Sequence, residues 1–237
     1  MLGIQFFICW VFVSLTAALY LQAEKTTNSL IHTLSQKEKS EILSIPLDYP
    51  FMKNEEKLAL IERFKQHAGV KEILLSDVGY MQGMSGNGLT TEKGNENSWV
   101  DISVMAVPAN FFSFMNIPIE QGRLPQTEKD IVVDNVWQEM QKKDVIGMNL
   151  YSGNTDYTIC GISAPFQANV YNRSSGYAFL PYDPSVYIGH CYIKSHPGQQ
   201  KEVARWIEKV YREMLPENIT YQAKTFLDDI HVLQALE

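Results

Sequence analysis

The sequence predicts an α+β fold in which an N-terminal transmembrane helix is followed by a two-lobed domain. Three observations predict it: an apolar run at the N-terminus, repeated switches between strand and helix periodicity, and β-α units at both ends of the remaining chain. Of the 237 residues, 45% are hydrophobic and 20% are charged, as in folded globular proteins. The net charge of −7, without a basic stripe, excludes a typical nucleic-acid-binding protein.

The transmembrane helix is expected over residues 1–22. Leu2 to Leu21 contains no charged side chain, and at about 1.5 Å per residue it spans roughly the 30 Å of a hydrocarbon core. A cleaved signal peptide is the alternative. We favour the uncleaved helix because the apolar run is long, no Lys or Arg precedes it, and no Ala-x-Ala cleavage site follows.

The next segment is predicted to be a stalk followed by a β-α-β unit. Residues 23–40 are polar and compatible with a helix, so they are expected to form the stalk. A strand is predicted at Glu41–Leu47, and a helix with Asn54 as its N-cap runs to Gly69. A second strand is predicted over Val70–Tyr80. The apolar residues at helical spacing are Leu58, Ile61 and Phe64.

The middle of the chain is predicted to consist mostly of strands. Met81–Asn97 is rich in Gly, Asn and Ser and is expected to form a mobile loop or hairpin tip. Trp99–Val107 alternates between polar and apolar residues in the manner of a strand. Further strands are expected as far as Ile193, interrupted by a helix near Val136–Lys142. The aromatic residues of Phe111–Met115 are expected to pack in the core.

The clearest helix is predicted over Gln199–Leu215, where apolar residues fall at spacings of four, three and four. A short strand at Ile219–Ala223 and a final helix at Thr225–Glu237 follow it. The apolar residues of the first helix are Val203, Ile207, Val210 and Met214, and those of the second are Ile230, Leu233 and Leu236.

This order of elements suggests that the two ends of the domain complete one sheet around an insertion. Residues 41–107 and 187–237 would form the first lobe, and residues 108–186 the inserted lobe.

The cysteines are predicted to be free. Cys9 lies in the apolar N-terminal run, whereas Cys160 and Cys191 lie in predicted strands. Buried free thiols are favoured because Cys is among the most buried residue types and a single bridge is not a disulfide framework. A Cys160–Cys191 disulfide is the alternative.

No catalytic or cofactor-binding residue is predicted. Gly83–Asn87 is the nearest match to a nucleophile elbow, but it lacks the final glycine. Gly86-Asn87-Gly88 begins a dinucleotide-binding pattern without its third glycine, and no helix opens there. The chain also lacks a phosphate-binding Gly-x-x-x-x-Gly-Lys-Ser/Thr loop.

No metal ligand is predicted either. His190 and His196 are expected at the surface or in loops, because six residues across a turn is not a ligand spacing. Asp228 and Asp229 would point about 100° apart on a helix, so they are not expected to converge on a cation. They are expected instead to place favourable charge near the start of the last helix.

From Val107 onward, several segments show features that occur together in one family. Val107–Arg123 contains a polar-aromatic-Phe turn, an Ile-Pro strand start and a closing Gly-Arg. The later segments are Asp130–Asn135, Ile146–Leu150, Tyr157–Ile162, Tyr192–Lys194 with the helix after it, and Thr225–Asp229. In this order they resemble the MacB-like periplasmic core domain of FtsX/MacB-type ABC transporter permeases, over about Trp99 to Glu237.

The sequence departs from this family in two respects. No basic residue precedes the N-terminal helix, and full permeases continue through three more membrane helices after this point. We therefore expect a fragment of a longer permease, a truncated gene product or an engineered piece.

The resemblance implies a non-enzymatic extracytoplasmic domain, without a cofactor, in the bacterial cytoplasmic (inner) membrane. The implied partners are a cytoplasmic ABC ATPase subunit, a second permease subunit in a dimer, the membrane, and a periplasmic partner or cargo. Residues 23–40 and 225–237 would act as lever arms that transmit ATP-driven motion of the membrane helices, which is mechanotransmission. The Met81–Asn97 loop would contribute to the partner surface, with a disordered hairpin tip as its alternative.

Two other classes of protein share some of these features. A membrane-anchored sensor domain of a signalling receptor is the main alternative, and it would need convergent polar groups in a pocket and a second membrane helix. An anchored periplasmic enzyme is disfavoured by the absence of a catalytic motif in the sequence.

Overall fold

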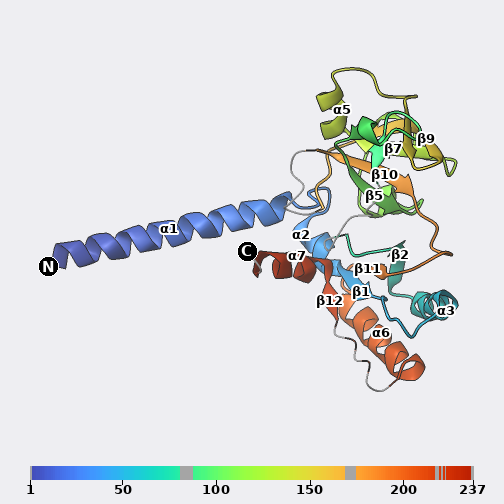
Figure 1. Cartoon of the computed structure of the whole chain (residues 1–237). Coiled ribbons are helices and arrows are strands. Elements are labelled where there is room, and N and C mark those ends of the chain that lie inside the picture. Colours follow the sequence, from blue (N-terminus) through green and yellow to red (C-terminus); the bar gives the residue numbers. More distant parts are fainter. Residues whose placement is uncertain are drawn as a thin grey trace.

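Two β-sheets organise the chain. The computed structural model describes residues 2–80, 88–168, 175–216, 219, 221 and 223–235. One sheet has four strands and the other has eight, and the helices pack around them (Figure 1). The long helix α1 (Leu2–Ser29) projects away from the body of the molecule.

The four-stranded sheet joins the two ends of the domain. Its order is β12-β1-β11-β2, and all neighbouring strands are antiparallel. The strands are β1 (Ile42–Pro46), β2 (Val70–Ser76), β11 (His190–Ser195) and β12 (Lys224–Thr225).

Both faces of this sheet are covered by helices. Successive side chains of a strand point to opposite faces, so one strand contributes to two cores. Leu43 and Ile45 of β1 pack in a core with α3 (Asn54–Lys65) and α6 (Gln200–Met214). Ile42 instead joins a second core with α7 (Phe226–Ala235) and α4 (Phe111–Phe114).

The eight-stranded sheet curls on itself. Its path is β4-β3-β8-β9-β7-β10-β5, and β6 pairs with β9 beside that path. β4 and β5 are the two ends of this path, and only Asp101 and Ile102 separate them in the chain. The strands are β3 (Leu89–Thr90), β4 (Trp99–Val100), β5 (Ser103–Val107), β6 (Ile119–Gly122), β7 (Asp130–Asp134), β8 (Asn149–Ser152), β9 (Thr155–Ser163) and β10 (Tyr177–Pro181). Helix α5 (Asn135–Gln141) buries Trp137 against this sheet.

Local capping fixes where several helices begin. Ser35 and Glu38 form a capping box at α2 (Gln36–Glu41), with the Glu38 N–H donating to Ser35 Oγ and the Ser35 N–H donating to Glu38 Oε2. Thr225 and Asp228 form the same arrangement at α7. At α5, Asp134 Oδ1 accepts from the Trp137 N–H at 3.0 Å.

Most predicted elements are confirmed at these positions, and two details are wrong. Asn54 is the first residue of α3 and not its N-cap, because its amide nitrogen donates to the carbonyls of Pro184 and Ser185. Met214 is 40% exposed although it follows the apolar spacing of α6. A strand lies at Lys224–Thr225, where it pairs with β1, whereas the strand expected at Ile219–Ala223 falls partly outside the described residues.

Two predicted segments are organised differently. Residues 30–41 do not extend as a stalk: Leu30, Ile31 and Leu34 are buried in the core, and α2 follows them. Residues 81–87 of the predicted mobile loop lie outside the described residues, whereas 88–97 contain β3 and part of a 3-10 turn (Glu96–Ser98). Strands β3, β4 and β5, which were assigned to the first lobe, pair in the eight-stranded sheet.

Side chains along α1 are exposed throughout the part where they are described, residues 6–21. Among the described residues, no helix combines the length and the apolarity needed to cross a bilayer.

The core on the α3–α6 side can be tested with two substitutions on one helix. Ile207 is fully buried, so Ile207→Ala is expected to lower the free energy of unfolding by about 2–5 kcal/mol. Met214→Ala, at the partly exposed end of α6, is the matched control and should cost less than about 1 kcal/mol. Urea unfolding followed by circular dichroism measures both values, and equal losses would contradict the packing described here.

Candidate functional site

The terminal helices meet on one face of the four-stranded sheet. α1 contacts α7, and α2 contacts α7, β1 and β12. Figure 1 shows the N-terminal helix and the C-terminus on the same side of the molecule. The first and last elements of the chain are therefore joined at one place, which we call the terminal-helix junction (α1, α2, α7 and β1).

A strained turn separates α1 from the rest of this junction. Ile31 has a φ of +47°, in the left-handed region that β-branched residues rarely adopt. Such a conformation costs on the order of 1–3 kcal/mol and persists only where its surroundings fix it. Here the Ile31 N–H donates to the Gln167 carbonyl at 2.8 Å, and the buried Lys39 Nζ donates to the Leu30 carbonyl at 2.7 Å. The direction in which α1 leaves the domain is thus set by tertiary contacts.

A buried polar network ties α7 to the sheet. The hydroxyl of Ser44 on β1 donates to Asp229 Oδ2 of α7, and it lies 2.8 Å from His190 Nε2 of β11. A hydroxyl has one hydrogen, so the Ser44 hydroxyl accepts from His190, whose Nε2 therefore carries the proton. The His190 ring also packs on Tyr192, with 4.5 Å between the ring centroids.

Burial shifts the titration of both ends of this network. It lowers the pKa of His190 from its ordinary 6.5 to about 4, and it raises the pKa of Asp229. His190 is therefore neutral at neutral pH. Ser44 is itself buried, and its hydroxyl is used by both neighbours, so the three residues form a structural connection instead of an activated nucleophile.

Buried lysines make a second set of polar connections. Lys194 of β11 donates from Nζ to the Phe114 carbonyl at 2.6 Å, and Lys57 of α3 donates to the Ile188 carbonyl at 2.7 Å. Burial lowers the pKa of both ammonium groups. Asn110, just before α4, donates to the Ile73 carbonyl of β2 at 3.0 Å. Both ends of α4 are thus fastened to the four-stranded sheet.

The histidines and aspartates considered above as metal ligands do not come together in one site. His190 is buried, so its expected position at the surface is wrong, whereas His196 is exposed. Asp228 caps α7 and Asp229 reaches Ser44, so the two carboxylates diverge as predicted. No three His, Cys, Asp or Glu side chains among the described residues could together hold a metal ion.

The predicted thiol and aromatic burial is confirmed. Cys160 and Cys191 are free and buried, which excludes the alternative disulfide. The aromatic side chains of Phe111–Met115 lie in the core. No sequence signal pointed to Ser44 or Lys194, because their partners are distant in the chain.

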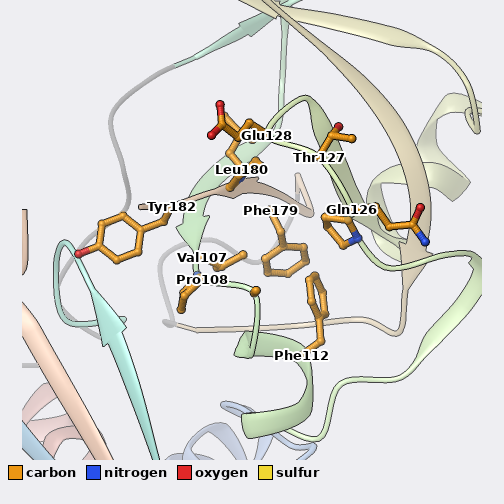
Figure 2. Close-up of a pocket in the computed structure, with 12 residues that line it drawn as sticks. Val107, Pro108, Phe112, Gln126, Thr127, Glu128, Phe179, Leu180 and Tyr182 are labelled. Atoms are coloured by element: carbon orange, nitrogen blue, oxygen red, sulfur yellow. The ribbon is translucent and has the colours of Figure 1, made fainter. Parts of the chain in front are cut away.

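An apolar cavity of about 310 Å³ lies where β5 leads into α4. The rings of Phe112 and Phe179 lie next to each other in its wall (Figure 2), packed edge to face with 5.3 Å between their centroids. The loop at residues 125–128 forms another wall, and Glu128 is the single charged residue among those that line the cavity. The lining is mostly apolar, so the cavity suits an apolar group.

An ion pair and two glycines hold that loop. Arg123 makes a bidentate pair with Asp130, at 2.8 and 3.0 Å, and lowers the pKa of that carboxyl well below its usual range. Gly122 has a φ of +74°, and a Cβ there would lie 2.3 Å from the Cys160 carbonyl oxygen. A Cβ on Gly161 would lie 2.4 Å from the Arg123 carbonyl oxygen. Both glycines are therefore required where the two strands approach closely.

Three solved structures share this arrangement. The periplasmic region of MacB from Actinobacillus actinomycetemcomitans has a TM-score of 0.54 and 11% identity, covering 86% of this chain and 97% of that one. The extracellular domain of the noncanonic ABC-type transporter YknZ from Gram-positive bacteria has a TM-score of 0.52 and 12% identity, covering 78% and 98%. A domain of a Porphyromonas gingivalis protein assigned as a permease has a TM-score of 0.53 and 12% identity, covering 82% and 98%.

This chain has the fold of a MacB-like periplasmic domain. The resemblance that began at Val107 is confirmed at the level of the fold. No protein-family model matches the chain, and no curated protein matches it in sequence.

The buried His190 of this MacB-like domain gives a testable pH dependence. Between pH 6.5 and about 4 the unfolded chain takes up a proton at this residue and the native protein does not, so stability falls as the pH falls. The loss should be on the order of 3 kcal/mol. His190→Gln, which keeps a donor for Ser44 but does not titrate, should show a correspondingly smaller loss.

Urea unfolding at pH 7.5 and pH 4.5 measures the difference. Asp229 has a raised pKa and so contributes with the opposite sign, losing stability as the pH rises, but it does so in both proteins. An identical pH dependence in the native chain and the variant would contradict the neutral state of His190.

Proposed function

We propose that the chain is the extracytoplasmic domain of an ABC transporter permease subunit in a bacterial cytoplasmic membrane, with its main domain on the periplasmic side. The fold supports this, because the similar structures are described as periplasmic or extracellular domains of MacB and of an ABC-type transporter. One observation carries the mechanism: the first and last helices meet on the same sheet, at the terminal-helix junction.

Attachment to the membrane through α1 is part of this proposal. The described side chains of α1, residues 6–21, are exposed on every side of the helix, and Phe6, Trp10 and Tyr20 are each about 70% exposed. A helix that is apolar all round is normally buried in protein or in lipid. Since these side chains have no protein cover, we place them in the bilayer.

Motion would pass from the helices to the sheet at the terminal-helix junction. α7 is connected to β1 by the bond between Ser44 and Asp229, and to the α1 side by its contacts with α1 and α2. A shift of α1 relative to α7 would therefore exert a force directly on β1. Packed elements respond to such a load as rigid bodies, which is mechanotransmission.

The two sheets would be the moving lobes. We propose that the four-stranded sheet belongs to the first lobe and the eight-stranded sheet to the inserted lobe, with the boundary moved from residue 107 to before Leu89 because β3, β4 and β5 pair in the eight-stranded sheet. The bonds of Lys194 to Phe114 and of Asn110 to Ile73 would transmit force between the lobes.

The remaining partners follow from the same proposal. The energy would come from a cytoplasmic ABC ATPase subunit, and the permease would act as a dimer. The domain itself would not be an enzyme, which is consistent with a cavity lining that lacks catalytic pairs. The cargo or partner would be met on the periplasmic side.

The location can be tested with a single introduced thiol. Val186 is 77% exposed, so Val186→Cys in a Cys9→Ser background is expected to react with a membrane-impermeant maleimide in intact cells. The control is Cys9→Ser alone, whose remaining thiols are buried and should stay unlabelled. Labelling of Val186→Cys only after lysis would contradict the proposed orientation.

The coupling can be tested at Asp229. Asp229→Ala removes the acceptor for Ser44 and should cost about 1–3 kcal/mol, with faster hydrogen exchange in α7. Asp229→Asn keeps an acceptor oxygen and is the matched control.

In the complex with the ATPase subunit, ATP is expected to change hydrogen exchange in β1 and β11 of the native chain and of Asp229→Asn, but not of Asp229→Ala. No effect of ATP on the native chain would contradict mechanotransmission through this junction.

A further inference from the structure

An exposed tryptophan stands in a polar cleft away from the terminal-helix junction. Trp99 of β4 is 60% exposed, and it lines a cleft of about 390 Å³ between the β3–β4 hairpin and the turn that joins β8 to β9. This volume lies within the range of small-molecule sites. Neither the cavity beside α4 nor the proposed lever mechanism uses this cleft.

The position of the indole ring is fixed by a glycine. A Cβ built on Gly88 would lie 1.5 Å from Cζ3 of Trp99, so the ring packs directly against the backbone at Gly88. Glycine is therefore required at this position for space. The contact holds the ring in place while most of its surface stays in solvent.

The wall beside the ring is rigid. The side chain of Asn95 accepts from the Asn97 N–H at 3.0 Å and donates to Glu92 at 2.7 Å, and the Ser98 hydroxyl donates to the Asn95 carbonyl at 2.8 Å. These hydrogen bonds join polar groups of the same turn to one another. They therefore organise the cleft before any ligand arrives, which lowers the entropic cost of binding.

Other polar groups in the cleft are free to bind a ligand. Within the described part of the chain, Glu96, Ser152 and Asn154 make no hydrogen bond through their side chains, and all three line the cleft. Gly153, between the last two, has open space around the position of a Cβ, so access from that side is not blocked. The free groups include both donors and acceptors but no cation.

We propose that this cleft binds a neutral carbohydrate, with one pyranose ring stacked on Trp99. A pyranose has an apolar C–H face that matches the exposed indole and a rim of hydroxyls that matches Ser152, Asn154 and Glu96. The lack of a cation in the lining and the carboxylate of Glu96 disfavour phosphate and other anions. A proline-rich peptide is disfavoured because it docks between several aromatic side chains, and Trp99 is the single aromatic residue in the lining.

The test uses the full chain in a zwitterionic detergent without a sugar head group. Chitotriose, cellotriose and maltotriose are added in turn, and saturation-transfer NMR and calorimetry measure binding. At least one of them is expected to bind with a Kd below about 1 mM, with saturation transferred to the C–H groups of one ring face. A panel in which none binds would overturn the proposal.

Substitutions then locate the site. Trp99→Ala should weaken binding by at least about tenfold, and Gly88→Ala should weaken it while keeping the tryptophan, because the new Cβ displaces the ring. Phe51→Ala removes another exposed aromatic side chain, outside the cleft, and should leave binding unchanged. Circular dichroism confirms that each variant is folded.

Two results would overturn the site even if a sugar bound. Equal affinity of the native chain and Trp99→Ala would place the sugar elsewhere, and tighter binding of a proline-rich decapeptide than of any sugar at Trp99 would make the cleft a peptide site. Because the readout is binding by the isolated chain, its failure is separate from a failure of the maleimide test of orientation.

Discussion

The Ser44 hydroxyl is the point through which the two ends of the chain are held together. β1 is an inner strand of the four-stranded sheet, paired with β11 on one side and β12 on the other. Its alternating side chains serve two different cores, and Ser44 is the polar exception on the face toward α7. A serine there satisfies both Asp229 and His190, so neither buried group is left without a partner. An apolar residue at this position would leave a carboxylate buried beside an imidazole with no bond between them.

The same principle explains the buried lysines. A buried ammonium group is expensive unless it is hydrogen-bonded, and Lys39, Lys57 and Lys194 each find a backbone carbonyl at 2.6–2.7 Å. Each of these carbonyls lies in or beside a turn or a helix end, where no ladder partner is available. The lysines therefore satisfy carbonyls at places where the chain changes direction. Lys194 does so between β11 and α4, which makes the position of α4 on the four-stranded sheet a consequence of tertiary bonding.

The sequence predicted the elements better than it predicted their connections. Helices α3, α5 and α6 follow from local periodicity, which survives in the fold because each buries its apolar face. The elbow at Ile31 could not be predicted, because nothing local favours a left-handed β-branched residue. The burial of His190 was missed for a related reason: its partners, Ser44 and Asp229, come from the opposite ends of the domain. The Gly, Asn and Ser content of Met81–Asn97 suggested a mobile loop, whereas side-chain bonds order the turn in its described part, residues 88–97.

The exposed apolar side chains of α1 and of Trp99 lie in different settings, and the difference between them is informative. Along α1 they cover all sides of a helix that leaves the domain, so their cover must come from outside the fold. Trp99 instead stands in a polar cleft, with the edge of its ring against Gly88 and with hydrogen-bonding groups around it. A lipid environment suits the first setting, since it needs no polar complement. The second setting matches the proposed ligand, which is apolar on one face and polar at its rim. The proposed attachment and the proposed recognition thus involve different sheets of the same domain: α1 is joined to the four-stranded sheet through α7 and β1, and Trp99 belongs to the eight-stranded sheet.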